Sequence, residues 1–563
     1  MFDKRTLIAF LLIGLIIIFS PAYYRLITDK QLPADTLTTN DRVYNSSSEI
    51  PGNNYNLIED EVLNEFSLPI LDTIPEKIFS IETNLFTADL SSKAGGSFIS
   101  FKLKDYVDYK KDFVELIDQK SGSINLGVEY KNIVGDEIFL DNNFYTSVSD
   151  NSYIRVSDRP YHIYFTQPVD NTTITKTLIF YPDSYVIDVV IDLTDLKRLG
   201  LIQNSFLLKW NGGLPLTENN HKDDISYFSA AIYQGGEIIT HSRKSNKSVS
   251  GSGLTDWTAI RTKYFTSAFI PQTESDFGQI FVNNDHDKIR NALNYPTYNM
   301  EIGLISEELA QVKLYLGPLK YDYIKSLNVE LEKIMNFGWA IIQPISHGVL
   351  LLLTFLYNYV PNYGLLLIVF SLIVKIVVYP LTKKSYLSTQ EMQAVQPLVA
   401  KMKEKYKNDP QRLNKETMKL YKEHGVNPLG GCLPLLLQMP LLMALFIVFR
   451  STIELRGAPF IFWIQDLSAP DTIFNLPFNI PIYGDQVSLL PLLMGVTMFI
   501  QQKSMAVQSS GQSKYMSHFM TVFFVLLFNS FPSGLNLYYT LFNLLTILQQ
   551  KYLTPSKRTL KPA

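Results

Sequence analysis

Apolar residues are unevenly spread along this chain of 563 residues. Residues 336–553 hold nearly all the long apolar stretches, whereas residues 28 to about 330 are polar and contain only short alternating runs. Long apolar stretches are typical of membrane helices, and short alternation is typical of half-buried strands. The pattern predicts an all-β domain followed by an α-helical membrane bundle.

An uncharged apolar segment, residues 7–19, follows Lys4 and Arg5 at the start of the chain. It matches both a secretory signal, with a cleavage site at residues 20–22, and a retained anchor formed by residues 1–27. Either one delivers the following residues out of the cytoplasm. Residues 28–60 lack periodicity and are rich in turn-forming residues, which predicts a flexible tether.

Residues 61–335 carry the β pattern. The runs 161–165, 173–180 and 185–193 alternate or are apolar and β-branched, with turn residues at 170–171 and 182–184. We expect a many-stranded antiparallel sandwich, closed by a helix near residues 321–335.

Five further apolar stretches follow, and with the first segment they predict six spans: residues 363–381, 431–449, 489–500, 519–529 and 535–548. Residues 336–360 are also apolar enough to insert. An extra crossing there would move a strongly basic loop outside, against the positive-inside rule. We therefore predict an interfacial helix at 336–360, a second span at 361–382 and the remaining four spans within 429–552.

That loop, residues 383–428, contains ten Lys and Arg residues. Val395, Leu398 and Met402 share one helix face, and Asp409-Pro410 signals the start of a second helix. A cytoplasmic helical hairpin is predicted, and both chain termini, including the basic tail 553–563, are placed in the cytoplasm. The basic residues of the hairpin have two possible roles. Either they only fix the topology, or they bind anionic lipid, the ribosome or the nascent chain. The candidate docking residues are Lys401, Lys403, Lys405, Arg412 and Lys415.

Lys375 lies inside the apolar run 365–381, where a cation costs roughly 2.5 to 3.5 kcal/mol. Either its stem reaches the cytoplasmic interface, ~9 Å away, or it faces a hydrated groove. No Asp or Glu occurs in a proposed span to neutralise it, so its anion would come from a partner. Other polar residues in the spans favour a groove: Ser371, Gln438, Asn536, Tyr538 and Tyr539.

Signals of catalysis are missing from the sequence. It has one cysteine, no GxxxxGK[ST] loop and no GxSxG elbow, and its histidines lack metal-ligand spacing. We predict no enzyme, no metal and no cofactor.

Several motifs in residues 339–552 resemble the YidC/Oxa/Alb family of membrane protein insertases. They are VVYPLT (377–382), NPLGGCLPLLLQMP (427–440), ELRGAPFIFWIQDLS (454–468), LPLLMGVTMF (490–499), FPSGLNLYY (531–539) and QQ (549–550). The resemblance implies a bacterial inner-membrane protein with a five-helix insertase core, a retained N-terminal anchor and a periplasmic β-super-sandwich.

The resemblance also implies a function: insertion and folding of nascent membrane proteins without nucleotide hydrolysis, either alone or beside the Sec translocon. In that family an arginine stands in a hydrophilic groove open to the cytoplasm and to lipid. Lys375 matches its position, which keeps the charge but not the guanidinium fork. Ser371, Gln438 and Tyr539 match groove contacts to the substrate.

Two other classes remain open at this stage. One is a secondary transporter or channel with Lys375 as an anion site, which would require an internal repeat that the sequence does not show. The other is an envelope assembly scaffold that acts through the β domain. Deletion of residues 60–320 would inactivate a scaffold and spare an insertase.

Overall fold

The structure, a computed structural model, describes residues 74–117, 124–169, 172–241, 248–273, 275–283, 297–305, 309–407, 409–426, 433–480, 483–505 and 511–552. The chain divides into two compact units, which are described separately. The first contains residues up to 260 and 267–316, and the second contains 261–266 and the rest. The predicted anchor, tether, basic tail and turn at 170–171 lie outside the described residues.

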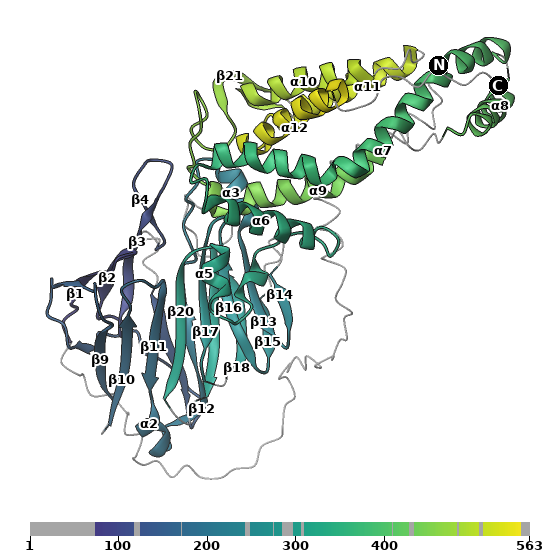
Figure 1. Cartoon of the computed structure of the whole chain (residues 1–563). Coiled ribbons are helices and arrows are strands. Elements are labelled where there is room, and N and C mark those ends of the chain that lie inside the picture. Colours follow the sequence, from purple (N-terminus) through teal and green to yellow (C-terminus); the bar gives the residue numbers. More distant parts are fainter. Residues whose placement is uncertain are drawn as a thin grey trace, which may run out of the picture. The chain divides into compact units, whose positions relative to one another are not determined.

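The first unit is built from three β-sheets (Figure 1). The five-stranded sheet has the order β4 (Phe113–Glu115), β3 (Ser97–Val107), β2 (Phe86–Ser91), β1 (Ile78–Glu82), β8 (Tyr153–Arg155). The six-stranded sheet has the order β15 (Val249–Ser252), β18 (Ser275–Asn283), β19 (Thr297–Ile305), β12 (Ile202–Trp210), β5 (Asn125–Asn132), β6 (Glu137–Phe139). The nine-stranded sheet has the order β14 (Glu237–Thr240), β13 (Ser229–Gln234), β16 (Thr255–Arg261), β17 (Phe265–Pro271), β20 (Ala310–Pro318), β11 (Val186–Asp192), β10 (Thr172–Phe180), β9 (Tyr161–Val169), β7 (Tyr145–Thr146). Two short helices, α2 (Thr194–Arg198) and α3 (His221–Tyr227), join strands.

The three strands that alternation predicted are confirmed as β9, β10 and β11, which pair antiparallel. Leu178 of β10 stands opposite Ile163 on one side and Val189 on the other, and all three are buried. Inward residues of period two therefore build the core, as the pleat requires. One pairing departs from the antiparallel prediction, because β1 runs parallel to β8.

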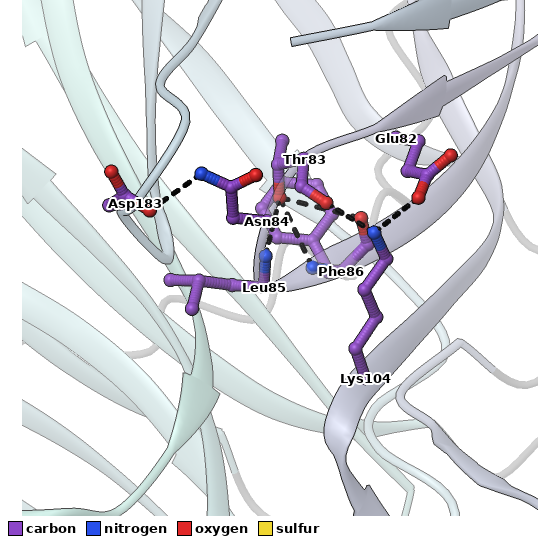
Figure 2. Close-up of polar contacts among 7 residues, drawn as sticks. All are labelled: Glu82, Thr83, Asn84, Leu85, Phe86, Lys104 and Asp183. Atoms are coloured by element: carbon purple, nitrogen blue, oxygen red, sulfur yellow. Dashed lines mark hydrogen bonds and ion pairs between the residues drawn. The ribbon is translucent and has the colours of Figure 1, made fainter. Parts of the chain in front are cut away.

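Side chains tie the turn between β1 and β2 to its neighbours. Thr83 Oγ1 accepts hydrogen bonds from the amides of Leu85 (3.2 Å) and Phe86 (3.1 Å), which satisfies donors that the turn leaves unpaired. Asn84 Nδ2 reaches Asp183 Oδ1 at 2.8 Å, in the turn after β10. Figure 2 shows these contacts beside the ion pair between Lys104 and Glu82. The turn thus links two sheets of the domain.

A lysine occupies one inward position of β10. Lys176 is fully buried, and its Nζ donates to the carbonyl oxygens of Ala94 (3.0 Å) and Leu126 (2.5 Å). The loop after β2 approaches β10 closely at Gly96, whose φ is +101° and where a Cβ would lie 2.7 Å from Leu178 Cδ1. Burial lowers the pKa of Lys176 to about 7. This side chain connects segments from three sheets.

The second unit contains the other described helices. They are α5 (Tyr321–Lys325), η2 (Leu331–Ile334), α6 (Gln343–Tyr357), α7 (Tyr363–Lys405), α8 (Pro410–Glu423), α9 (Leu433–Ser451), η4 (Ile453–Leu455), α10 (Leu489–Met505), α11 (Gly511–Phe528) and α12 (Ser533–Tyr552). Helix α12 packs against α7, α9 and α10, and α6 packs against α7 and α9 (Figure 1). The helix expected near residues 321–335 is instead two short pieces, because Asn328 and Glu330 adopt positive φ between them.

The predicted second span and first hairpin helix form one continuous helix, α7, of 43 residues. Asp409 accepts a hydrogen bond from the amide of Arg412 and caps α8, as the Asp-Pro pair predicted. The hairpin has its own apolar core: Val395, Val399, Leu420 and Val426. Because this core is small and local, the two helices are held by their facing apolar stripes.

The described apolar helices differ in whether they are long enough to cross a bilayer. Within the described residues, one helical segment, Tyr363–Pro380, has the length and mean hydropathy (2.2) to cross a membrane. Shorter apolar helical segments are Gln343–Tyr357, Gln438–Ser451, Leu489–Gln502 and His518–Phe528. The sequence also failed to predict a strand pair between α9 and α10, formed by β21 (Thr472–Ile480) and β22 (Gly484–Ser488).

Candidate functional site around Lys375

Lys375 points from α7 toward α12 and is only 8 % exposed. Its Nζ donates to Thr546 Oγ1 at 2.7 Å and lies 4.4 Å from the centroid of the Phe542 ring. These partners are one turn apart on α12. The ammonium therefore makes a hydrogen bond with the hydroxyl of Thr546 and a cation–π contact with the ring of Phe542. The side chain therefore turns into the helix bundle.

The charge of Lys375 has no counter-ion in the part of the chain that the structure describes. Its contacts there are a neutral hydroxyl and an aromatic ring, and no described carboxylate lies within 4.0 Å of Nζ. A buried ammonium normally requires a paired anion or several acceptors. Among the described residues, the ammonium of Lys375 is thus left without an anionic partner, and it can still donate further hydrogen bonds.

Ser371 lies one turn before Lys375 on the same face of α7 and is fully buried. Its Oγ donates to the carbonyl of Leu367 at 2.6 Å, so its proton is used within the helix. The neighbouring Phe370 packs on Tyr538 of α12, with ring centroids 5.8 Å apart. Ser371 thus stands on the α7 face that meets α12.

Tyr538, Tyr539 and Gln438 form a second polar group between α9 and α12. The side chain of Gln438 lies next to both phenols. Among the described residues, however, Gln438 Nε2 and the two hydroxyls have no hydrogen-bond partner of standard geometry. Buried polar atoms without protein partners generally bind water or a ligand. The rings of Tyr538 and Phe542 also pack together, with centroids 5.8 Å apart, which connects this group to the Lys375 site.

Asn536 has a different role. It is fully buried, and its Nδ2 donates to the carbonyls of Phe528 (3.1 Å) and Phe531 (3.3 Å). These bonds close the connection between α11 and α12. The side-chain amide is therefore engaged with backbone, while its Oδ1 has no partner among the described residues.

The five hairpin cations chosen from the sequence are all exposed: Lys401, Lys403, Lys405, Arg412 and Lys415. Lys405 and Arg412 flank the ring of Tyr406, at 5.4 Å and 5.3 Å from its centroid. The structure groups these residues on α7 and α8, apart from the apolar hairpin core.

Sequence reasoning missed the two immediate partners of Lys375. Thr546 is a polar residue within the apolar run of α12. It follows Phe542 by four residues and Asn543 by three, which predicts that the three side chains share one helix face. Its hydroxyl donates to the carbonyl of Phe542 at 2.7 Å while accepting from Lys375. No local signal indicated that this face would meet Lys375.

Two family models match this chain. Residues 79–347 match the YidC periplasmic domain, and residues 355–559 match the 60Kd inner membrane protein family. The membrane protein insertase YidC of Chloroherpeton thalassium is 35 % identical over 99 % of this chain and 96 % of the relative. That of Prosthecochloris aestuarii is 37 % identical over 86 % of this chain and 84 % of the relative. A crystal structure of an active YidC insertase with its first transmembrane domain resolved is 18 % identical and covers 85 % of this chain and 95 % of that one, with a TM-score of 0.35.

A β-rich periplasmic domain joined to an apolar helical region defines a class of inner-membrane protein. Within that class, the chain belongs to the YidC family of membrane protein insertases. The two relatives are named membrane protein insertases, so the family is one of insertases rather than enzymes. The predicted family, inner-membrane location and periplasmic domain are confirmed.

Proposed function

We propose that Lys375 supplies the positive charge of a hydrated groove, where it attracts the polar or acidic outer segment of a nascent membrane protein. The observation that carries this proposal is a buried ammonium without a described counter-ion. Phe542 and Tyr538 connect it to buried polar atoms that have no hydrogen-bond partner of standard geometry among the described residues. The apolar helix of the substrate then moves into lipid along the apolar faces of α9 and α11. No nucleotide is needed.

The energetics favour such a route. A charged segment that crosses a full hydrocarbon layer loses its hydration, at a cost of several kcal/mol or more for each ion. A cation about 8 Å away would offset about 2 kcal/mol of that cost at an effective dielectric constant near 20. Groove water would supply the remaining hydrogen bonds. Ser371, Gln438, Tyr538, Tyr539 and Asn536 are the proposed contacts of the translocating segment.

The proposed topology follows from charge. Residues 1–27 form a retained anchor, residues 28–60 a tether and residues 61–335 the exported domain. Residues 336–360 lie along the outer face, and the ten cations between 383 and 428 stay in the cytoplasm with both termini. Five spans, at 361–382 and within 429–552, then form the insertase core.

Partners of two kinds are proposed. The exposed hairpin cations Lys401, Lys403, Lys405, Arg412 and Lys415 suit anionic lipid headgroups or the ribosome. The Sec translocon is proposed as a lateral partner for substrates that need it.

Site-specific photocrosslinking tests the groove. We expect a photoreactive residue at Ser371 or Tyr539 to crosslink to a stalled nascent membrane protein, because both positions border the proposed path. Ile376 is the matched control, since it neighbours Lys375 on α7 but is 72 % exposed on the outside of this chain. Crosslinks that form equally at all three positions, or at Ile376 alone, would exclude a groove on the Lys375 side.

A further inference from the structure

The β21–β22 hairpin between α9 and α10 exposes large apolar side chains. It forms a two-stranded sheet, and every residue of β21 is exposed or half-exposed. Phe474 is 53 % exposed and Phe478 is 60 % exposed. An isolated two-stranded hairpin is only marginally stable in water, and contiguous exposed apolar residues usually mark an interaction surface.

The sequence of β21 is amphipathic. Phe474, Leu476 and Phe478 alternate with Asn475, Pro477 and Asn479, so the large apolar side chains favour one face, although Ile473 falls on the other. The register shifts within β21. Asn475 pairs with Gln486 and Ile480 pairs with Gly484, so the longer stretch of β21 lies opposite a shorter stretch of β22. The strand therefore bulges between Asn475 and Ile480, and Phe478 within the bulge is exposed.

The base of the hairpin is fastened to the ends of the apolar helices. Asp471 Oδ2 accepts from the amides of Leu489 (3.1 Å) and Leu490 (2.7 Å), the first residues of α10. Asn529, at the end of α11, donates to the carbonyls of Tyr483 (2.9 Å) and Gln486 (2.6 Å) and accepts from the amide of Ser488. In Figure 1, β21 lies beside the start of α10. The hairpin is thus held at the level where these helices end.

The charge and the backbone of the hairpin indicate which kind of partner covers its exposed apolar side chains. Residues 472–488 contain one charged side chain, Asp485, which offers little to a charged protein surface. Pro477 lies in the middle of β21 and has no N–H to donate, so it weakens strand addition by a partner chain. The hairpin instead continues into α10, whose exposed apolar residues include Leu492, Val496 and Phe499.

We propose that the β21–β22 hairpin lies in the outer lipid interface, with Phe474 and Phe478 inserted toward the acyl chains. The backbone stays at headgroup level, because an open sheet edge in hydrocarbon would leave its polar groups unpaired. Aromatic rings favour that interface, and apolar faces there penetrate ~5–10 Å. The hairpin then anchors the outer ends of α10 and α11. This inference rests on the proposed topology, in which α10 starts at the outer face.

Fluorescence quenching in vesicles tests the proposal with the full chain. In a Cys432→Ser background, single cysteines at Phe474, Phe478, Asn475 or Asn479 carry an environment-sensitive fluorophore. Vesicles of phosphatidylethanolamine and phosphatidylglycerol contain lipid with a nitroxide either near the headgroup or deep in the acyl chain. Val496 on α10, 56 % exposed, is the lipid control, and Val134 in the β domain, 81 % exposed, is the water control.

We expect labels at Phe474 and Phe478 to be quenched by the shallow nitroxide about twofold more strongly than labels at Asn475 and Asn479, because their side chains enter the interface. Iodide, added in the aqueous phase, should quench the label at Val134 but not the labels at Phe474 and Phe478. If Val496 reports lipid but Phe474 and Phe478 are quenched by iodide, the hairpin is in water and the inference fails alone. Shielding from both quenchers would mean a protein occupant and would also overturn it. If Val496 itself reports no lipid, the topology and the inference fall together.

Discussion

Lys375→Glu is expected to reduce insertion of a single-span substrate with an acidic outer segment at least about tenfold, because an attraction of about 2 kcal/mol becomes a repulsion of similar size. The new carboxylate would face Phe542 and Thr546, where the ammonium had an aromatic face and an acceptor. Lys375→Arg should retain most activity, since the charge persists. Insertion is measured by protease protection of the substrate in a strain depleted of its own insertase.

Lys383→Glu serves as the matched control, because it reverses an exposed charge about two turns further along α7. It should insert the substrate nearly as well as the parent chain. A substrate with a neutral outer segment should be much less sensitive to Lys375→Glu. Normal insertion of the acidic substrate by the Glu variant, present at the parent's level in the membrane, would refute the charge role.

Raising the pH from 7 to 9 is expected to stabilise the β domain through Lys176. Its pKa falls from 10.5 in the unfolded chain to about 7 in the folded domain, because burial disfavours the ammonium. Between these values the unfolded chain binds more protons, so stability rises with pH across this window. The gain is about 1.4 kcal/mol per pH unit, or up to about 3 kcal/mol over the two units. A neutral amine also has two N–H groups, which match the carbonyls of Ala94 and Leu126.

Lys176→Met should remove this slope and leave those two carbonyls without a donor, at about 1–3 kcal/mol each. Thermal unfolding of the domain in the full chain, followed by the fluorescence of buried Trp210 and Trp257, measures both effects. Lys102→Met, at an exposed position of β3, is the control and should keep the parent's pH dependence. A parent chain whose unfolding temperature is flat or falls between pH 7 and 9 would contradict the buried neutral amine.

Much of the local structure could be predicted from the sequence. Strands β9, β10 and β11 were readable because alternating residues commit one face to the core, and Asp409-Pro410 fixed the start of α8. The β21–β22 hairpin was missed because its apolar face has no core partner, and its alternation is short and contains Pro477. The continuity of α7 through Pro380 and Pro397 was also missed, since proline usually signals a helix end.

The site was predicted only in part. A lysine in an apolar run is conspicuous because of its insertion cost, so Lys375 stands out from the sequence alone. Its contact with Thr546 joins residues 171 positions apart, and no local pattern reports such a distance. Lys176 shows the same limit, because an inward lysine in β10 is visible from alternation, but its two carbonyl acceptors lie 82 and 50 residues away.

By itself, the sequence determined that this protein has an exported β domain and an apolar helical region with a costly cation, because hydrophobic periodicity and charge act over a few residues. Only the tertiary structure decided that Lys375 faces α12 rather than the end of its own helix, and which polar atoms near it lack hydrogen-bond partners among the described residues. The physical reason is that the environment of a buried charge is set by chain segments distant in sequence, whose approach depends on packing of the whole bundle.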